Sequence, residues 1–596
     1  MLFMAVGLHA QWKPCGDKIK TAWAEKINPS EVLNEYPRPQ MERAAWMNLN
    51  GLWNYAIRPK GQVEPKSFDG DILVPFCAES ALSGVMKTVG AANELWYKRM
   101  FSVPADWRGK DILLNFGAVD WRVDIFVNDI LIGSHTGGFT PFKFNITPFL
   151  NKSGKQKLTV RVWDPTDKGE QPIGKQRVKP EGIWYTPVTG IWQTVWLEPI
   201  SPENHIETIK AIPDIDTRTI DVTVGAGVKS ADDVVCVSLF DKGREVASAR
   251  GVHGNTLRLT VNDMRLWSPA DPYLYDMKVT LTRNGKTVDE VKSYTAFRKV
   301  STARGSDGHM RICLNGKPLF NYGPLDQGWW PDGLYTAPTD EALRYDVIKT
   351  KQWGFNMIRK HIKVEPARWY YHCDKEGVLV WQDMPSRNTG GNTWEARVYN
   401  GGTDVHRSEF SERTYYKELK EMIDFGVSFP CIIMWVPFNE AWAQFDTEKV
   451  AAWVKDYDPS RLVNPASGGN HRACGDVLDL HIYPGPEMYM ADPARVTVIG
   501  EYGGIGLPLK KHLWVDTNNW GYVQFKTPED VTREYVKYAG EMKRLVGLGV
   551  SAAVYTQTTD VEVEVNGLMT YDRKVVKVNE QQVCEANQAV INALNR

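Results

Sequence analysis

The chain has 596 residues, and its 71 lysines and arginines nearly balance its 72 aspartates and glutamates, leaving a formal net charge of −1. This balance, without a run of basic residues, argues against a nucleic-acid or membrane-surface partner held by bulk charge. Such a length exceeds one hydrophobic core and predicts roughly three to five domains. The 23 tryptophans and 24 tyrosines suit sugar binding and ordinary packing equally well.

The N-terminus, MLFMAVGLHAQ, is a short apolar stretch typical of the end of a secretory signal with cleavage before Gln11. Residues 1–10 are therefore interpreted as a signal remnant of a periplasmic or secreted protein, with a merely hydrophobic N-terminus as the alternative. No later stretch of about 20 apolar residues predicts a membrane span. The eight cysteines lie far apart without zinc-site spacing, so most are expected to be free thiols.

Short alternating strands separated by turn residues fill the first half of the chain. Between about residues 40 and 200, segments such as "QKLTVRVWD" carry β-branched and aromatic residues in alternation, which predicts a jelly-roll β-sandwich over residues 11–200. Residues 201–302 show about seven strands, with a hairpin turn at Asn284-Gly285. That rhythm predicts an immunoglobulin-like β-sandwich.

From residue 303 to 596, short apolar runs alternate with helical stretches such as the one that begins at Thr339 and stops at Gly354. This alternation predicts a parallel sheet, and a count of eight strands predicts a (β/α)8 TIM barrel. An open doubly wound sheet is the main alternative, but no glycine-rich phosphate turn follows the first strand. The eight candidate strands are 319–323, 355–359, 378–383, 432–440, 462–467, 477–483, 496–501 and 551–557.

In such a barrel the active site is built at the carboxyl ends of the strands, where polar residues have functional meaning. Glu440 and Glu501 are the only glutamates that end predicted strands. A carboxylate pair of this kind, one protonated and one ionised, suits retaining glycoside hydrolysis, with the groups about 5 to 5.5 Å apart. The alternatives are that each glutamate pairs with an arginine such as Arg359, or that Asp326, Asp383, His481 and the glutamates bind a metal.

Four segments together carry a resemblance to glycoside hydrolase family 2, which contains β-galactosidases, β-glucuronidases and β-mannosidases. They are "EYPRPQMERAAWMNLNGLWNYAI", "LWSPADPYLYD", "WVPFNEAW" and "VIGEYGG". The resemblance extends over nearly the whole chain. It implies the same order of domains: a jelly-roll sugar-binding domain, an immunoglobulin-like sandwich and a catalytic barrel.

The resemblance also implies roles for individual residues. Glu440 would be the acid/base and Glu501 the nucleophile, while Asn439 would hydrogen-bond the sugar 2-hydroxyl. Arg359 and Tyr483 would support the nucleophile. The further candidates for substrate binding, from strand ends and the following loops, are Asp326, Trp381, Asp383, His481, Trp514 and Gln557.

Other segments depart from the family's better-known members. "IRKHIKVEP" stands where many β-galactosidases and β-glucuronidases have a Ser-His pair, and no Asn-x-Lys-Gly element typical of glucuronide binding is present. The loops 384–410 and 503–526 are expected selectivity elements. Their tryptophans, Trp394, Trp514 and Trp520, together with Trp329 and Trp330, are either stacking platforms for sugars or packing residues.

The sequence therefore predicts a retaining exo-glycosidase acting on an oligosaccharide or glycoside, with β-galactosidase as the first assignment. β-Mannosidase, β-glucuronidase and arabinosidase activities are the alternatives within the family, and a non-catalytic carbohydrate-binding protein is the alternative outside it. The chemistry requires no cofactor and no metal. A homo-oligomer is compatible with the sequence.

Overall fold

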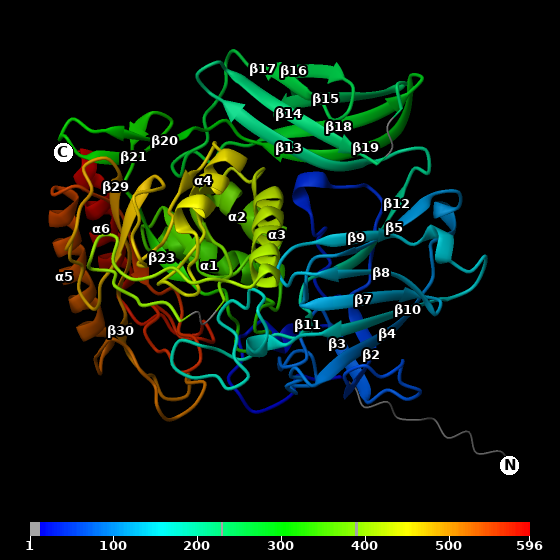
Figure 1. Cartoon of the computed structure of the whole chain (residues 1–596), viewed down its shortest axis with the longest axis horizontal. Helices are drawn as coiled ribbons and strands as arrows, with labels where there is room; N and C mark the ends of the chain where they lie inside the picture. Colours follow the sequence, from blue (N-terminus) through cyan, green and yellow to red (C-terminus); the bar gives the residue numbers. More distant parts are fainter. Residues whose placement is uncertain (1–11, 228–229, 388–390, 596) are drawn as a thin grey trace.

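The computed structural model describes residues 12–227, 230–387 and 391–595, so the predicted signal remnant, residues 1–10, lies outside the described residues. Figure 1 shows three bodies: a sandwich of blue and cyan strands, a second sandwich that contains strands β13–β19, and a barrel coloured from green to red. None of the helices in the described part is long and apolar enough to cross a membrane.

The first body is a sandwich of antiparallel strands, as predicted. Its larger sheet has the order β3-β2-β4-β10-β7-β8 and its smaller sheet the order β1-β12-β5-β9. The alternation in the sequence explains the packing: in β10, Leu158, Val160 and Val162 point into the core, while Lys157 and Arg161 are only partly buried. The strands are β1 (Met47–Asn48), β2 (Gly51–Pro59), β3 (Gly70–Val74), β4 (Asn93–Phe101), β5 (Asp111–Phe116), β6 (Val119–Asp120), β7 (Arg122–Val127), β8 (Ile130–Thr136), β9 (Phe142–Asn145), β10 (Gln156–Trp163), β11 (Gly190–Ile191) and β12 (Val195–Ile200).

The second body is a seven-stranded antiparallel sandwich with sheets β13-β14-β17 and β16-β15-β18-β19. The predicted hairpin is present: Asn284 and Gly285, at φ 50° and 76°, join β18 to β19. Two successive positive φ values are what a tight turn between twisted strands requires. The strands are β13 (Ile206–Asp214), β14 (Thr219–Ala226), β15 (Asp233–Asp241), β16 (Arg244–Gly251), β17 (Thr256–Thr260), β18 (Tyr275–Arg283) and β19 (Lys286–Thr295).

The third body is a barrel of eight strands in the order β27-β26-β25-β24-β23-β32-β29-β28, and every pairing within it is parallel. Its strands are short buried apolar runs, as a sheet covered on both faces demands. They are β23 (Asn321–Asp326), β24 (Met357–Lys360), β25 (Leu379–Asp383), β26 (Ile432–Val436), β27 (Leu462–Val463), β28 (Val477–His481), β29 (Val496–Gly503) and β32 (Val550–Thr556). Beside the barrel lie two small sheets, formed by β20 (Val300–Arg304), β21 (Met310–Leu314) and β22 (Lys317–Pro318), and by β30 (Ile505–Gly506) and β31 (Val523–Gln524).

Within the described residues, α-helices follow six of the eight barrel strands, and none follows β27 or β28. Sequence signals explain several helix ends: Thr339 caps the first helix, Ser408 caps the third, and Gly377 ends the second at a left-handed φ of 72°. The helices are α1 (Asp340–Gln352), α2 (Ala367–Glu376), α3 (Glu409–Gly426), α4 (Thr447–Tyr457), α5 (Pro528–Val546) and α6 (Glu580–Ile591).

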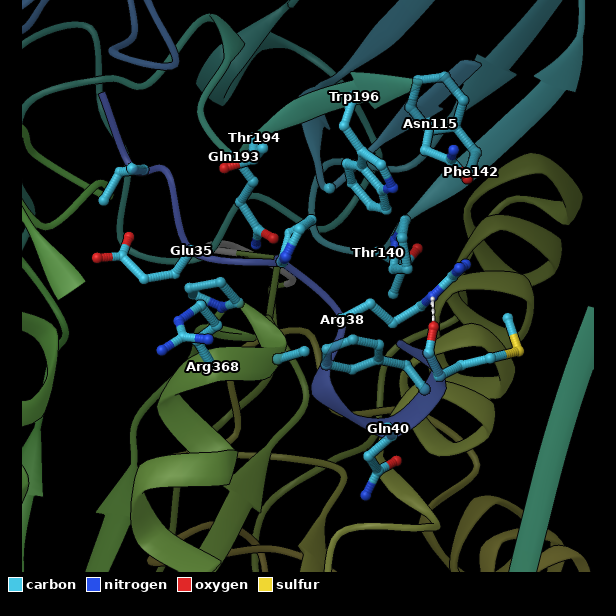
Figure 2. A pocket seen from close by; sticks show the side chains of 18 of the residues that line it. Glu35, Arg38, Gln40, Asn115, Thr140, Phe142, Gln193, Thr194, Trp196 and Arg368 are labelled. Atoms are coloured by element: carbon cyan, nitrogen blue, oxygen red, sulfur yellow. Dashed lines mark hydrogen bonds between the residues drawn. The ribbon is translucent and has the colours of Figure 1, made fainter. Parts of the chain in front are cut away.

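The first sandwich and the barrel share one hydrophobic core. Tyr185 and Trp192 of the first sandwich pack in the same cluster as Trp329, Trp330 and Tyr335 of the barrel. A cavity of about 390 Å³ lies at the junction of all three bodies (Figure 2), lined by residues such as Arg38, Trp196 and Arg368. No residue predicted for the active site lines this cavity.

Candidate active site

The predicted fourth strand ends earlier than expected. β26 stops at Val436, and Asn439 and Glu440 lie on the turn that follows, where Glu440 has a φ of 47°. The backbone N–H of Glu440 donates to the carbonyl of Ser467 at 2.9 Å, which holds this turn against the next strand segment. A left-handed conformation is uncommon for a residue other than glycine and is frequent at functional sites.

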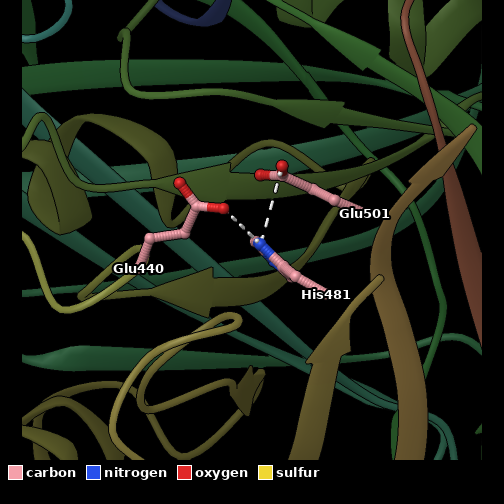
Figure 3. Close-up of side chains that lie close together, drawn as sticks. All are labelled: Glu440, His481 and Glu501. Carbon is pink, nitrogen blue, oxygen red and sulfur yellow. Dashed lines mark hydrogen bonds and ion pairs between the residues drawn. The ribbon is translucent and has the colours of Figure 1, made fainter. Parts of the chain in front are cut away.

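The two glutamates predicted as a pair face each other across His481 (Figure 3). The Nδ1 atom of His481 lies 3.0 Å from Oε1 of Glu440 and 3.5 Å from Oε2 of Glu501. One oxygen of each carboxylate and one ring nitrogen of His481 all lie within 4.8 Å of one another. This is the short separation of retaining glycosidases, whereas inverting enzymes need about 6.5 to 9.5 Å between the two carboxyl groups.

Glu501, on β29, is buried and held by two donors. Arg359 Nη1 donates to its Oε1 at 3.1 Å, and the Tyr483 hydroxyl donates to its Oε2 at 2.7 Å. Burial alone would raise the pKa of Glu501, but the nearby charges of His481, Arg359 and Lys175 and the Tyr483 hydrogen bond lower it below its usual value. This carboxyl is therefore ionised over the ordinary pH range, as a nucleophile must be.

Arg359 connects the strand ends, because its guanidinium contacts groups on three neighbouring segments. Besides Glu501 it donates to both oxygens of Asp383, at 3.1 and 2.9 Å, and to Oδ1 of Asn439 at 2.8 Å. On the far side of this network His361 Nδ1 lies 2.8 Å from Asp383. Burial, with the nearby charges of Lys175 and Arg359, holds the pKa of His361 well below its usual value, so this imidazole is neutral.

Asp383 thus supports Arg359 and lies behind it, while His481 lies between the two glutamates. Although burial opposes the charged form of His481, Glu501 and Glu440 raise its pKa. Its Nε2 atom lies 2.8 Å from the Ser467 hydroxyl, which fixes the ring. Glu440, His481 and Glu501 could also each offer one ligand atom to a cation.

Four residues predicted as substrate contacts have partners of their own within the protein, and their contact with a substrate stays a prediction. Asp326 pairs with Lys360 at 2.7 Å, Trp381 is fully buried and donates toward Asn321, and Gln557 is fully buried against Asn566. Trp514 packs edge-on against Tyr571 with Lys18 over its ring.

The loop tryptophans differ in their exposure and in their contacts. Trp329 and Trp330 are packing residues, each only 2% exposed. Trp520 contacts Tyr522 at 5.3 Å between ring centroids, and its indole N–H donates to Gly182 at 3.3 Å. Trp394 is 54% exposed and is held in place by a hydrogen bond from its indole N–H to the Gly468 carbonyl at 2.8 Å.

Several residues that lie beside the two glutamates were not predicted from the sequence. Tyr522 stacks on Tyr483 with the ring centroids 3.6 Å apart. Trp442, two residues after Glu440, meets Trp184 of the first sandwich at 4.9 Å. Lys175, also from the first sandwich, interacts electrostatically with Glu440 and Glu501. No signal within the segment around Lys175 distinguishes it from a surface loop, because only the packing of two domains brings it here.

Comparison with known proteins matches three family models along the chain. The sugar binding domain of glycosyl hydrolases family 2 matches residues 85–197, the family 2 model itself residues 204–298, and the family 2 TIM barrel domain residues 311–501. These matches cover the two sandwiches and most of the barrel in the order described above. The chain belongs to glycosyl hydrolases family 2.

Curated relatives carry two kinds of name. A β-galactosidase of Thermoanaerobacter pseudethanolicus is 25% identical over 59% of this chain and 46% of its own length. A β-glucuronidase of Streptococcus agalactiae is 23% identical over 70% of both chains. The chain spans less than half the length of several of these relatives.

Solved structures show the same fold. A β-D-glucuronidase of Dictyoglomus thermophilum superposes with a TM-score of 0.72 at 19% identity, covering 92% of this chain and 98% of its own. At this level of identity the likeness describes the fold alone.

Proposed function

We propose that the protein is a retaining glycosidase that removes terminal sugar residues from glycosides by double displacement. The observation that carries the proposal is the short separation of the Glu440 and Glu501 oxygens, within 4.8 Å, at the mouth of a family 2 barrel. Trp184 of the first sandwich contacts Trp442, and Tyr522 stacks on Tyr483, so aromatic side chains from two domains lie beside the pair, which favours exo action on a chain end.

In the first step, an oxygen of the ionised Glu501 attacks the anomeric carbon. The bond to the leaving-group oxygen breaks, and Glu440 gives its proton to that oxygen. In the second step Glu440 takes a proton from water, whose oxygen replaces Glu501 at the anomeric carbon. Both glutamates return to their starting protonation state, so the reaction requires no cofactor.

The polar groups around the pair suit these roles. Arg359 and Tyr483 keep Glu501 ionised and oriented before the attack. Asn439 accepts from Arg359 through Oδ1, whereas its buried Nδ2 atom has no hydrogen-bond partner among the described residues. A buried amide N–H without a partner is costly, and a hydroxyl of the bound sugar would satisfy it.

The sugar itself is a separate question. The β-galactosidase assignment made from the sequence stays a prediction, and curated relatives named β-galactosidase and β-glucuronidase support the two activities about equally. β-Glucuronidase is the second candidate, because Lys175 brings an additional positive charge to the site.

A panel of 4-nitrophenyl glycosides tests the proposal. We expect the wild type to hydrolyse at least one β-glycoside, and Glu501→Gln and Glu440→Gln to lower kcat by roughly 10³-fold or more, as expected when a nucleophile or a general acid is removed. Glu529→Gln, on the exposed start of α5, is the control and should behave as the wild type.

Two other outcomes would point to other classes of protein. A wild type that binds glycosides but hydrolyses none would be a non-catalytic carbohydrate-binding protein. Activity that is lost on chelation and restored by a divalent cation would instead make Glu440, His481 and Glu501 metal ligands, and would contradict the covalent mechanism.

A further inference from the structure

A lysine of the first sandwich, Lys175, lies close to Trp442, two residues after Glu440. Lys175 lies between β10 and β11, in a segment whose backbone is pinned: Tyr185 N–H donates to the Lys175 carbonyl at 2.8 Å. The next residue, Gln176, donates its side-chain amide to Asp120 at 2.7 Å. Lys175 is 5% exposed, so packing against neighbouring residues fixes its position.

The Lys175 ammonium lies near two aromatic rings and interacts electrostatically with three acids. Its Nζ atom is 5.6 Å from the ring centroids of both Tyr185 and Trp442. Electrostatic interactions couple it to Glu564, Glu501 and Glu440, in that order. Burial nevertheless lowers the pKa of Lys175, which shows that these acids do not fully compensate the lost hydration.

Each of the three acids is already engaged by another residue. Glu564 accepts from the Tyr185 hydroxyl at 2.5 Å and from Asn566 at 3.1 Å. Glu501 is held by Arg359 and Tyr483, and Glu440 by His481, as described above. Lys175 Nζ makes no hydrogen bond and no ion pair with any residue that the structure describes, in contrast to the fully committed guanidinium of Arg359.

A buried ammonium without a close counter-ion is costly, and a ligand that brings one recovers that cost. A sugar hydroxyl would accept a hydrogen bond but leave the charge uncompensated. A carboxylate would supply both a charge and up to two acceptor oxygens, and hydrogen bonds between charged groups are roughly twice as strong as neutral ones.

We propose that Lys175 is a specificity-determining residue that binds the carboxylate of a uronic acid in the sugar-binding pocket. The inference rests on the proposed glycosidase function and deepens it, because it selects acidic sugars over their neutral counterparts. The recognition group comes from the first sandwich, so the substrate would be held between two domains.

The experiment compares matched substrates that differ only at C6: the 4-nitrophenyl β-glucuronide with the β-glucoside, and the β-galacturonide with the β-galactoside. The variants are Lys175→Met, Lys175→Arg and, as a control on the same segment, the exposed Lys179→Met. We expect the ratio of kcat/KM for the acidic over the neutral sugar to fall roughly 10- to 100-fold in Lys175→Met. Lys175→Arg should recover part of the ratio, and Lys179→Met should not change it.

An unchanged ratio would overturn the proposal. If Lys175 served only to keep Glu501 ionised, Lys175→Met would lower both activities equally and move the acidic limb of both pH profiles alike. Calorimetric titration of free D-glucuronate and D-glucose into the wild type and Lys175→Met provides a readout that needs no turnover. Weaker binding of glucuronate alone in the variant would support the role of Lys175 even if no glycoside were hydrolysed, whereas equal binding by both proteins would contradict it.

Discussion

At the scale of single residues, the charge state of Glu501 follows from its neighbours. The carboxylate is buried, which disfavours charge, yet the Arg359 ion pair at 3.1 Å and the Tyr483 hydrogen bond at 2.7 Å reverse that effect. His481 adds positive charge between the two glutamates, because these acids raise its pKa. The three groups together keep Glu501 ionised, as the proposed mechanism requires of a nucleophile.

Tyr483→Phe tests this explanation through pH. Removing the hydroxyl removes a hydrogen bond to the ionised form, so the pKa of Glu501 should rise from its lowered value. Activity requires ionised Glu501, and the acidic limb of kcat/KM should therefore move to higher pH, by about one unit. A lowered kcat with an unmoved limb would show that Tyr483 orients the nucleophile without affecting its ionisation.

At the scale of elements, helices and strands could be predicted from the sequence. The residues at which the strands near the candidate site end were harder to predict. The helix predicted to begin at Thr339 and stop at Gly354 is α1, Asp340–Gln352, because a cap and a stop residue mark its ends. Glu440 was expected on a strand and lies on a turn at φ 47°. The conformation of that turn depends on Ser467, in a segment more than 20 residues away, which no local pattern encodes.

The loop after β25 carries an exposed aromatic side chain held in a fixed position. Trp394 donates to the Gly468 carbonyl, and a Cβ on Gly468 would lie 2.1 Å from the His481 ring, so these groups are in close contact on the Glu440 side. The leaving group departs on the side of the acid, where an aromatic face can bind it.

Trp394→Ala should therefore raise KM for glycosides with large or aromatic leaving groups roughly 2- to 10-fold, as expected for one lost aromatic contact. Glycosides with a methanol leaving group should be little affected. Val398→Ala, at an exposed position of the same loop, is the matched control. Equal effects on both leaving-group classes would place Trp394 outside this subsite.

At the scale of the whole molecule, the site is assembled by domains that pack as one unit. Thr336 and Trp329 of the barrel contact Trp192 and Tyr185 of the first sandwich, and these contacts bring Lys175 and Trp184 to the catalytic pair. The order of the three domains was readable from strand rhythm and family motifs. The contacts between domains could not be predicted from the sequence, because two complementary folded surfaces leave no periodic pattern in either segment.

The central claim is that Glu501 forms the covalent bond to the sugar. Incubation with an activated 2-deoxy-2-fluoro glycoside of the sugar that the panel identifies should inactivate the enzyme. The fluorine slows both steps, whereas the activated leaving group speeds only the first, so the glycosyl-enzyme accumulates. We predict that peptide mass spectrometry finds one fluorosugar attached to Glu501. A label on Glu440 or on any other residue, or continued turnover without any label, would contradict the account.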